Sequence, residues 1–291
     1  MTSAQRIAGA PISWGVSEVS GWGYQMSRER VLKEMRALGL AATEAGPTGF
    51  LPEEPVEMRE FLARCDMTLV GGFTPLVLHE GDGWRANLNT VAHRFSAAGA
   101  DVIVLAAATG LGDYDARADL SANDWRRLLQ ALDAADGLAA EHGLQLVFHP
   151  HVGTLVEKSE EIDRVLEGST VPLCLDTGHV MLGGGDPVAI AGRAPERIRH
   201  LHLKDVDAEM ARRVASGALA FSDAVRAGVF RPLGDGDVDV RAIVRSVRAA
   251  GYDRWYVLEQ DVMLDAEPAD GSGPQEDVAR SLAYLQQSLA V

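Results

Sequence analysis

Eight short apolar segments, each followed by a longer segment of helical character, run through the whole chain of 291 residues. The apolar segments have the length of buried strands. They are expected at 6–12, 42–45, 68–76, 101–107, 144–148, 171–175, 198–203 and 255–258. Strands that alternate with helices form a parallel sheet covered on both faces. Eight such units predict a closed (β/α)8 TIM barrel, which needs about 250 residues.

The segments between the strands carry helix start and stop signals. Ser121 is placed to cap a helix over 121–143, because Asp124 follows it three residues later and Gly143 ends the pattern. Residues 28–40 put five apolar side chains on one broad face, with a glycine as the stop. Segments 159–169 and 238–251 repeat this scheme, so we expect helices there too.

The alternative architecture is an open, doubly wound sheet. The first strand is not followed by a glycine-rich turn with dinucleotide-binding spacing, which disfavours that architecture. No linker rich in proline, glycine or serine divides the chain, so residues 1–291 are expected to form a single domain. A helical insertion around 206–230 is predicted to pack near the barrel mouth as one or two helices.

Composition and charge exclude several classes of protein. The net charge of −15 disfavours a nucleic-acid partner, because an acidic surface repels phosphate backbones. No run of about 18 apolar residues is present, so no membrane span is expected. The first residues lack the apolar core of a secretion signal, and the two cysteines have no metal-binding spacing. These features predict a cytoplasmic protein.

Polar residues gather where the predicted strands end, and six of the eight histidines are among them. In a barrel, active sites lie at the carboxyl ends of the strands. The residues at these ends are Ser13, Trp14, Glu44, Thr74, His79, Glu80, His149, His151, Glu157, Asp176, His179, His200, His202, Lys204, Asp205, Glu259, Gln260 and Asp261.

Each of these side chains alone has an ordinary structural explanation. His149 can be a hydrogen-bonded core residue, Asp176 a helix cap, and Glu259 a solvated loop acid. Together, several acids and imidazoles at one end of a barrel would bury uncompensated charge. A divalent cation removes this problem, because it binds carboxylate oxygen and neutral imidazole nitrogen. In "IRHLHLKD", strand alternation places His202 with Lys204 on the inner face, which makes His202 the best imidazole ligand.

The motifs "CLDTGH", "HLHLKD" and "YVLEQD", in this order, resemble the xylose isomerase-like barrels of the sugar phosphate isomerase/epimerase superfamily. Within that superfamily, the segments "FHPHVGTLVEKSEEID", "FRPLGDGDVD", "APISWGVSE" and "TEAGPTGFLP" are similar to the inosose dehydratase branch. The resemblance covers nearly the whole chain. It implies a (β/α)8 barrel and one divalent metal ion, usually manganese or cobalt and sometimes zinc or magnesium.

The resemblance also implies a ligand set. Asp176, His202 and Glu259 match the metal ligands that follow or lie on strands six, seven and eight of the family. The family's acid at the end of strand five has no direct match here. Either Glu157 reaches back as the fourth ligand or His151 binds the metal, and we favour Glu157 because "HVGTLVE" can fold an acid over the site.

The absence of a carboxylate at the end of strand five favours elimination over epimerisation, because an epimerase needs two opposed bases. The expected activity is that of a metal-dependent hydro-lyase acting on a cyclic keto-polyol such as 2-keto-myo-inositol, in inositol catabolism. The expected catalytic residues are Glu259, His151, His179 and Lys204. The expected substrate-binding residues are Trp14, Glu44, His149, His179 and Arg231.

Three alternatives remain open from the sequence. A sugar or keto-sugar isomerase or epimerase would use the same metal. An apurinic-site endonuclease of the same superfamily would need a basic DNA-binding face, which a net charge of −15 disfavours. A non-catalytic barrel that binds a keto-sugar is the third. The sequence leaves both a homodimer and a homotetramer open.

Overall fold

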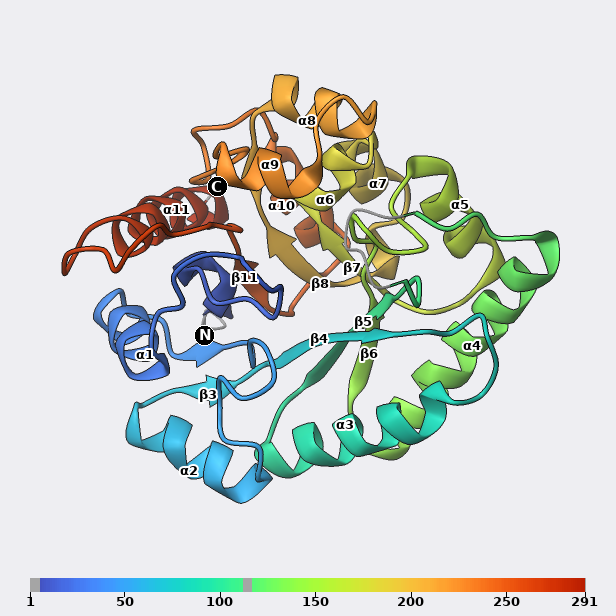
Figure 1. Cartoon of the computed structure of the whole chain (residues 1–291), viewed down its shortest axis with the longest axis horizontal. Coiled ribbons are helices and arrows are strands. Elements are labelled where there is room, and N and C mark those ends of the chain that lie inside the picture. The colour runs from blue at the N-terminus through green and yellow to red at the C-terminus, as the bar shows by residue number, and fades with distance from the viewer. Residues whose placement is uncertain (1–5, 112–116, 291) are drawn as a thin grey trace.

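A single sheet of parallel strands curls into an almost closed barrel, and helices surround it (Figure 1). The computed structural model describes residues 6–111 and 117–290. Neighbouring strands follow the order β3-β2-β1-β11-β8-β7-β6-β5-β4. The strands are β1 (Ile7–Gly9), β2 (Ala42–Thr43), β3 (Thr68–Leu69), β4 (Gly71–Leu76), β5 (Val102–Ala107), β6 (Gln145–Phe148), β7 (Leu173–Asp176), β8 (Ile198–Leu203) and β11 (Tyr256–Leu258).

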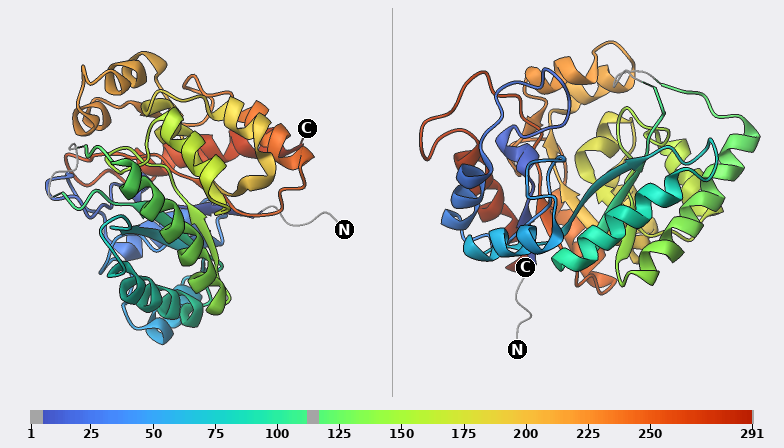
Figure 2. Two further views of the ribbon diagram at one scale, coloured as in Figure 1. Left: turned by 90° about the vertical axis from the view of Figure 1, so that its right-hand side faces the viewer. Right: turned by 60° about the horizontal axis from the view of Figure 1, so that its bottom comes forward.

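Helices cover the outer face of this sheet on all sides, as the two further views in Figure 2 show. The α-helices are α1 (Arg28–Ala37), α2 (Pro55–Arg64), α3 (Trp84–Ala98), α4 (Ala122–Glu141), α5 (Ser159–Gly168), α6 (Thr177–Leu182), α7 (Pro187–Arg193), α8 (Ala208–Ala215), α9 (Phe221–Arg226), α10 (Val240–Ala249) and α11 (Pro274–Ala290). Two short 3-10 helices are η1 (Pro11–Trp14) and η2 (Pro195–Arg197). No helix in the described ranges is long and apolar enough to cross a membrane. The predicted (β/α)8 barrel is confirmed.

The third predicted strand, over 68–76, is divided at Val70 into β3 and β4. β3 pairs with β2, whereas β4 pairs with β5. The Val70 N–H donates to Thr43 at 2.9 Å, and the Val70 carbonyl accepts from Asp101 and Val102 on the other side. Val70 is therefore where the barrel closes, and β3 and β4 together occupy one strand position among eight.

The first strand ends earlier than its apolar pattern predicted, at Gly9 instead of residue 12. Pro11 has no N–H to give to a neighbouring strand and begins η1 instead. The predicted cap of the long helix is confirmed: the Ser121 hydroxyl accepts from the Asp124 N–H at 3.2 Å, and the Asp124 carboxylate accepts from the Ser121 N–H. This reciprocal pair satisfies two N–H groups at the start of α4.

The barrel interior is apolar at one end and polar at the other. Val104, Val147 and Cys174 form part of a small buried cluster inside the barrel. Along the same inward-facing rows, His149 follows Val147 and Asp176 follows Cys174. Because side chains alternate across a strand, the rows that fill the barrel also carry the polar residues at its carboxyl end.

The segment predicted as a helical insertion contains α8 and α9. It is bounded by an antiparallel pair formed by β9 (Asp205–Val206) and β10 (Phe230–Arg231). Phe221 of α9 and Phe230 lie with their ring centroids 5.7 and 6.1 Å from that of His179. The insertion thus covers His179, which follows the carboxyl end of β7.

The buried carboxylate of Asp205 anchors the return from this insertion. It accepts backbone hydrogen bonds from Val206, Gly234, Gly236 and Val238 at 2.8–3.1 Å. A Cβ atom at Gly236 would lie 2.3 Å from the Asp205 carboxylate, so only glycine fits there. The "GDGD" turn therefore holds the backbone in place around one acid.

We expect Asp205→Ala to lower the free energy of unfolding by about 2–4 kcal/mol, because it leaves several buried N–H groups without an acceptor. Urea titration followed by circular dichroism measures this loss. Asp235→Ala, in the same turn but half-exposed, is the control and should change stability by less than about 1 kcal/mol. Equal stability of the two variants would contradict the anchoring role.

Candidate active site

The register of three neighbouring strands brings the central side chains together. Asp176 of β7 is paired directly with His202 of β8, and Val257 of β11 is paired with His202 on the other side. Glu259 lies two residues beyond Val257, so its side chain falls on the same inner face. The strand order β11-β8-β7 therefore places the two acids on either side of one imidazole.

Four ligand-type atoms converge at this point. The Nδ1 atom of His202 lies 2.6 Å from Glu259 Oε2 and 3.6 Å from Asp176 Oδ2. The Nε2 atom of His149 lies 3.2 Å from His202 Nδ1 and 3.4 Å from Asp176 Oδ2. Asp176, His202 and Glu259 offer atoms that all lie within 4.8 Å of one another. Two imidazoles and two carboxylates thus face one small volume.

The hydrogen bonds on the far sides of both imidazoles orient these nitrogens. His149 Nδ1 donates to the Pro150 carbonyl at 2.9 Å, which leaves the lone pair on Nε2. His202 Nε2 donates to Glu44 Oε1 at 3.0 Å, which leaves its lone pair on Nδ1. Histidines that bind metals are held in this way by an acceptor on their other nitrogen.

A second observation indicates that these four side chains suit a divalent cation. Asp176 Oδ2 and Glu259 Oε2 are buried and lack a hydrogen-bond donor of good geometry among the described residues. Buried carboxylate oxygens normally have such partners. A cation between the two acids and the two imidazoles would satisfy them. His149, Asp176, His202 and Glu259 could hold a metal together, and a mixed set of nitrogen and oxygen donors suits manganese, cobalt or zinc.

Lys204 is almost completely buried beside this group. Its Nζ atom lies 3.1 Å from Asp176, 3.2 Å from Glu259 and 2.9 Å from Asp261. Burial would lower the pKa of Lys204, but the three carboxylates outweigh burial and hold that pKa well above its ordinary value. The ammonium therefore stays charged, and it lies over the Phe230 ring at 5.5 Å.

His151 and His179 lie against each other at the edge of the site, with ring centroids 3.7 Å apart. Burial, together with nearby His149 and Lys204, lowers the pKa of His151 to about 3. Burial, followed by the electrostatic effect of His151, also holds the pKa of His179 well below its ordinary value. Both imidazoles are therefore neutral near pH 7. His151 Nδ1 donates to the Val152 carbonyl at 2.6 Å, which makes Nε2 its basic nitrogen.

Glu44 supports the site from the other side of the barrel. It is buried and accepts from both His200 and His202, at 2.9 and 3.0 Å. Burial would raise the pKa of Glu44, but the two histidines outweigh it and keep this carboxyl ionised. Glu44 also lines the cavity described below. It therefore contacts His202 and also stands where the sequence predicted a substrate-binding residue.

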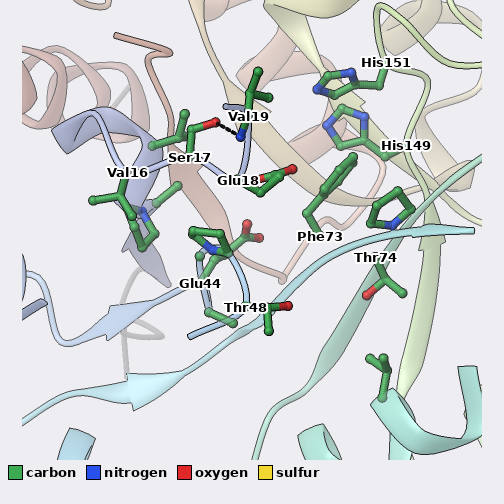
Figure 3. A pocket seen from close by; sticks show the side chains of 18 of the residues that line it. Val16, Ser17, Glu18, Val19, Glu44, Thr48, Phe73, Thr74, His149 and His151 are labelled. Carbon is green, nitrogen blue, oxygen red and sulfur yellow. Dashed lines mark hydrogen bonds between the residues drawn. The ribbon is translucent and has the colours of Figure 1, made fainter. Parts of the chain in front are cut away.

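A cavity of about 550 Å³ opens onto these residues (Figure 3). His149, His151, His202, Glu259 and Asp261 line one end of it. The remaining wall comes from the loops that follow β1 and β2, from β4 and from α3. Cavities of about 300–1,000 Å³ are usual for small-molecule sites.

Three residues predicted for the site lie elsewhere. The Glu157 carboxylate is 2.6 Å from Arg117 and accepts from the Gly153 N–H at 2.9 Å, apart from the four converging ligand atoms. Trp14 is fully buried among core residues, and its Nε1 donates to Glu34 at 2.8 Å. The partners of these two side chains, Arg117 for Glu157 and Glu34 for Trp14, could not be predicted from the pattern of apolar and polar residues.

The third is Arg231, which is exposed and lies 3.6 Å from Asp207 at the surface. Asp261, in contrast, was given no role from the sequence, although it lines the cavity and contacts Lys204. Its signal was present in "LEQD", because alternation from Glu259 places Asp261 on the same side of the chain.

The fold and the site define a TIM-barrel protein with a candidate metal centre at the carboxyl ends of its strands. Residues 32–288 match the family described as xylose isomerase-like TIM barrel, and the chain belongs to that family.

Two curated relatives match most of the chain. An inosose dehydratase of Lacticaseibacillus casei is 30% identical over 294 residues, which cover 97% of this chain and 96% of the relative. The rhizopine catabolism protein MocC of Rhizobium meliloti is 34% identical over 88% of this chain and 81% of its own length.

Two solved structures share the fold. An L-ribulose 3-epimerase superposes with a TM-score of 0.69 at 16% identity, covering 98% of this chain and 95% of its own. The probable 3-DHS dehydratase AsbF of Bacillus anthracis superposes with a TM-score of 0.65 at 15% identity, covering 97% and 99%. At these identities the likeness concerns the fold.

Replacing Trp14 tests whether it belongs to the core. We expect Trp14→Phe to lower the free energy of unfolding by about 1–3 kcal/mol, because it removes the hydrogen bond to Glu34 and leaves a void. Metal content, measured by mass spectrometry of the purified protein, should not change. A variant of normal stability with weakened ligand binding would restore Trp14 to the substrate wall.

Proposed function

We propose that the protein is a metal-dependent hydro-lyase that removes water from a cyclic keto-polyol, with 2-keto-myo-inositol as the reference substrate. The observation that carries this proposal is the convergence of His149, Asp176, His202 and Glu259 at the end of a cavity. The full-length match to relatives named inosose dehydratase supports the same reading.

The proposed ligand set differs from the family pattern at one position. His149 directly follows β6, at the strand end where the family resembled in sequence carries an acid. Its Nε2 faces His202 and Asp176. We propose His149 as the fourth ligand in place of Glu157, which pairs with Arg117. A bound divalent ion would act as a Lewis acid toward the substrate ketone and an adjacent hydroxyl.

The residues around this position can move the two protons that elimination requires. His151 is neutral, lines the cavity and carries its lone pair on Nε2, so it is suited to remove the proton next to the ketone. Asp261 lines the cavity, and burial raises the pKa of its carboxyl to about 6, so it can carry the proton for the departing hydroxyl, with the Lys204 ammonium holding it in place at 2.9 Å. His179 supports the His151 ring by stacking.

The alternative activity is epimerisation, which needs a proton acceptor on each face of the substrate. The end of β6 carries histidine where a second, opposed carboxylate base would stand, whereas Glu259 and Asp261 face the cavity from the β11 side. This asymmetry favours elimination. Location in the cytoplasm, assembly into a homodimer or homotetramer, and manganese or cobalt as the bound ion stay predictions from the sequence.

Metal content separates the two candidate ligands. We expect His149→Ala to lose most of the bound ion, because it removes one of four ligands, whereas Glu157→Gln should retain it. Inductively coupled plasma mass spectrometry after dialysis against limiting metal measures both variants. Loss of metal from Glu157→Gln with retention in His149→Ala would reverse the assignment.

The activity test follows the dione product of 2-keto-myo-inositol by ultraviolet absorbance, in deuterated solvent. We expect dione formation, and we expect His151→Gln to reduce kcat by roughly 10²–10⁴-fold with unchanged metal content, because it removes the proposed base. Recovery of deuterated, stereochemically inverted substrate without dione would show that the protein is an epimerase.

A further inference from the structure

The barrel has a local opening between its second and third strand positions. The last backbone hydrogen bond there runs from the Ala45 N–H to the Gly71 carbonyl, at 2.8 Å. Beyond it, β4 continues to Leu76 while β2 ends at Thr43, so in the described residues this edge of β4 has no strand partner. Pro75 lies on the open stretch, which suits a residue that cannot donate to a neighbouring strand.

The cavity continues through this opening to the helix outside. Its lining includes both Phe73, which faces the barrel interior, and Thr74, on the opposite side of the same strand (Figure 3). It then reaches Asn87, Thr90 and Arg94 of α3. These three residues are spaced by three and four positions and therefore share one face of the helix.

Arg94 is the only lysine or arginine among the described residues that line the cavity. Its Nε atom is buried and has no hydrogen-bond partner among the described residues. No carboxylate within the described ranges comes close enough to form an ion pair with Arg94. A buried guanidinium nitrogen without an acceptor is costly, and the planar donor pattern of the guanidinium group matches a carboxylate or a phosphate.

The two ends of the cavity therefore have opposite chemical character. Glu44, Glu259 and Asp261 line the end that faces the candidate metal centre, where a ketone and its hydroxyls would bind. The α3 end offers a guanidinium, with the amide of Asn87 and the hydroxyl of Thr90 on the same face. A ligand that matches the charge at the α3 end would carry an anionic group in addition to its polyol part.

We propose that Arg94 binds an anionic substituent, a carboxylate or a phosphate, of the substrate. The preferred substrate is then an anionic cyclic keto-polyol, and a neutral cyclic keto-polyol binds more weakly. This inference rests on the proposed function for the ketone end of the cavity. The anion subsite itself rests only on the opening beside β4 and on Arg94.

The test compares three probes by calorimetric titration of the metal-loaded protein. The probes are neutral 2-keto-myo-inositol, the carboxylate 3-dehydroshikimate and the phosphate ester myo-inositol 1-phosphate. We expect at least one anionic probe to bind more tightly than the neutral one. Arg94→Gln should weaken that binding by roughly 10–100-fold, the effect of losing a charged hydrogen bond, and should weaken inosose binding less than about twofold. The anionic probe that responds identifies carboxylate or phosphate as the ligand group.

Arg85→Gln is the matched control. Arg85 lies on the same helix, pairs with Asp82 at the surface and does not line the cavity, so its removal should leave all three affinities unchanged. Arg94→Lys retains the charge without the planar donors and should keep part of the preference, which guards against a misfolded glutamine variant. Equal losses for neutral and anionic probes, or no loss at all, would overturn the proposal.

Binding without turnover keeps this inference separate from the proposed function. Dehydration of 2-keto-myo-inositol that does not depend on Arg94, with no preference for either anion, would leave the proposed function standing and remove the anion subsite. Binding of an anionic probe that depends on Arg94, in a protein that dehydrates neither ketone, would do the reverse.

Discussion

Four carboxylates at one end of the barrel, three buried and one partly buried, must be balanced by positive charge, and the rest of the site depends on how that is done. Glu44, Asp176, Glu259 and Asp261 face a region that contains one permanent cation, Lys204. Lys204 contacts three of them, and Glu44 is served by two imidazoles. One ammonium cannot neutralise this set, which is why the oriented nitrogens of the site make sense as ligands for a divalent ion.

The same strand alternation that fills the barrel also builds the site. The inward row of β8 holds His200 and His202 and continues to Lys204, which directly follows the strand, while Leu201 and Leu203 lie in the hydrophobic core on the other face. Because the interior is tightly packed below this level, small apolar residues such as Val147 and Cys174 support the polar layer from beneath. The position of each ligand is therefore fixed by strand register and not by a flexible loop.

Much of this arrangement could be predicted from the sequence, and the limits have physical causes. Periodicity predicted the strands, and the positions of Asp176, His202 and Glu259 at strand ends predicted that they would meet. Sequence could not predict the partner of a loop side chain: Glu157 was expected to fold over the site, but the distant Arg117 lies against it. The sequence predicted a substrate-binding role for His149. The hydrogen bond from its Nδ1 to the Pro150 carbonyl turns Nε2 toward His202 and Asp176, and this bond depends on local backbone geometry that the sequence does not show.

The division of the third strand connects the closure of the barrel to the shape of the cavity. A barrel in which β4 paired with β2 along its full length would end the cavity at Phe73, and only the metal-facing end would remain. The switch of partners at Val70 leaves the later residues of β4 unpaired on one side, so the cavity extends to α3 and to Arg94. A feature that looks like a defect in the sheet therefore adds a second, oppositely charged end to the site, and substrate choice can change there without altering the metal ligands.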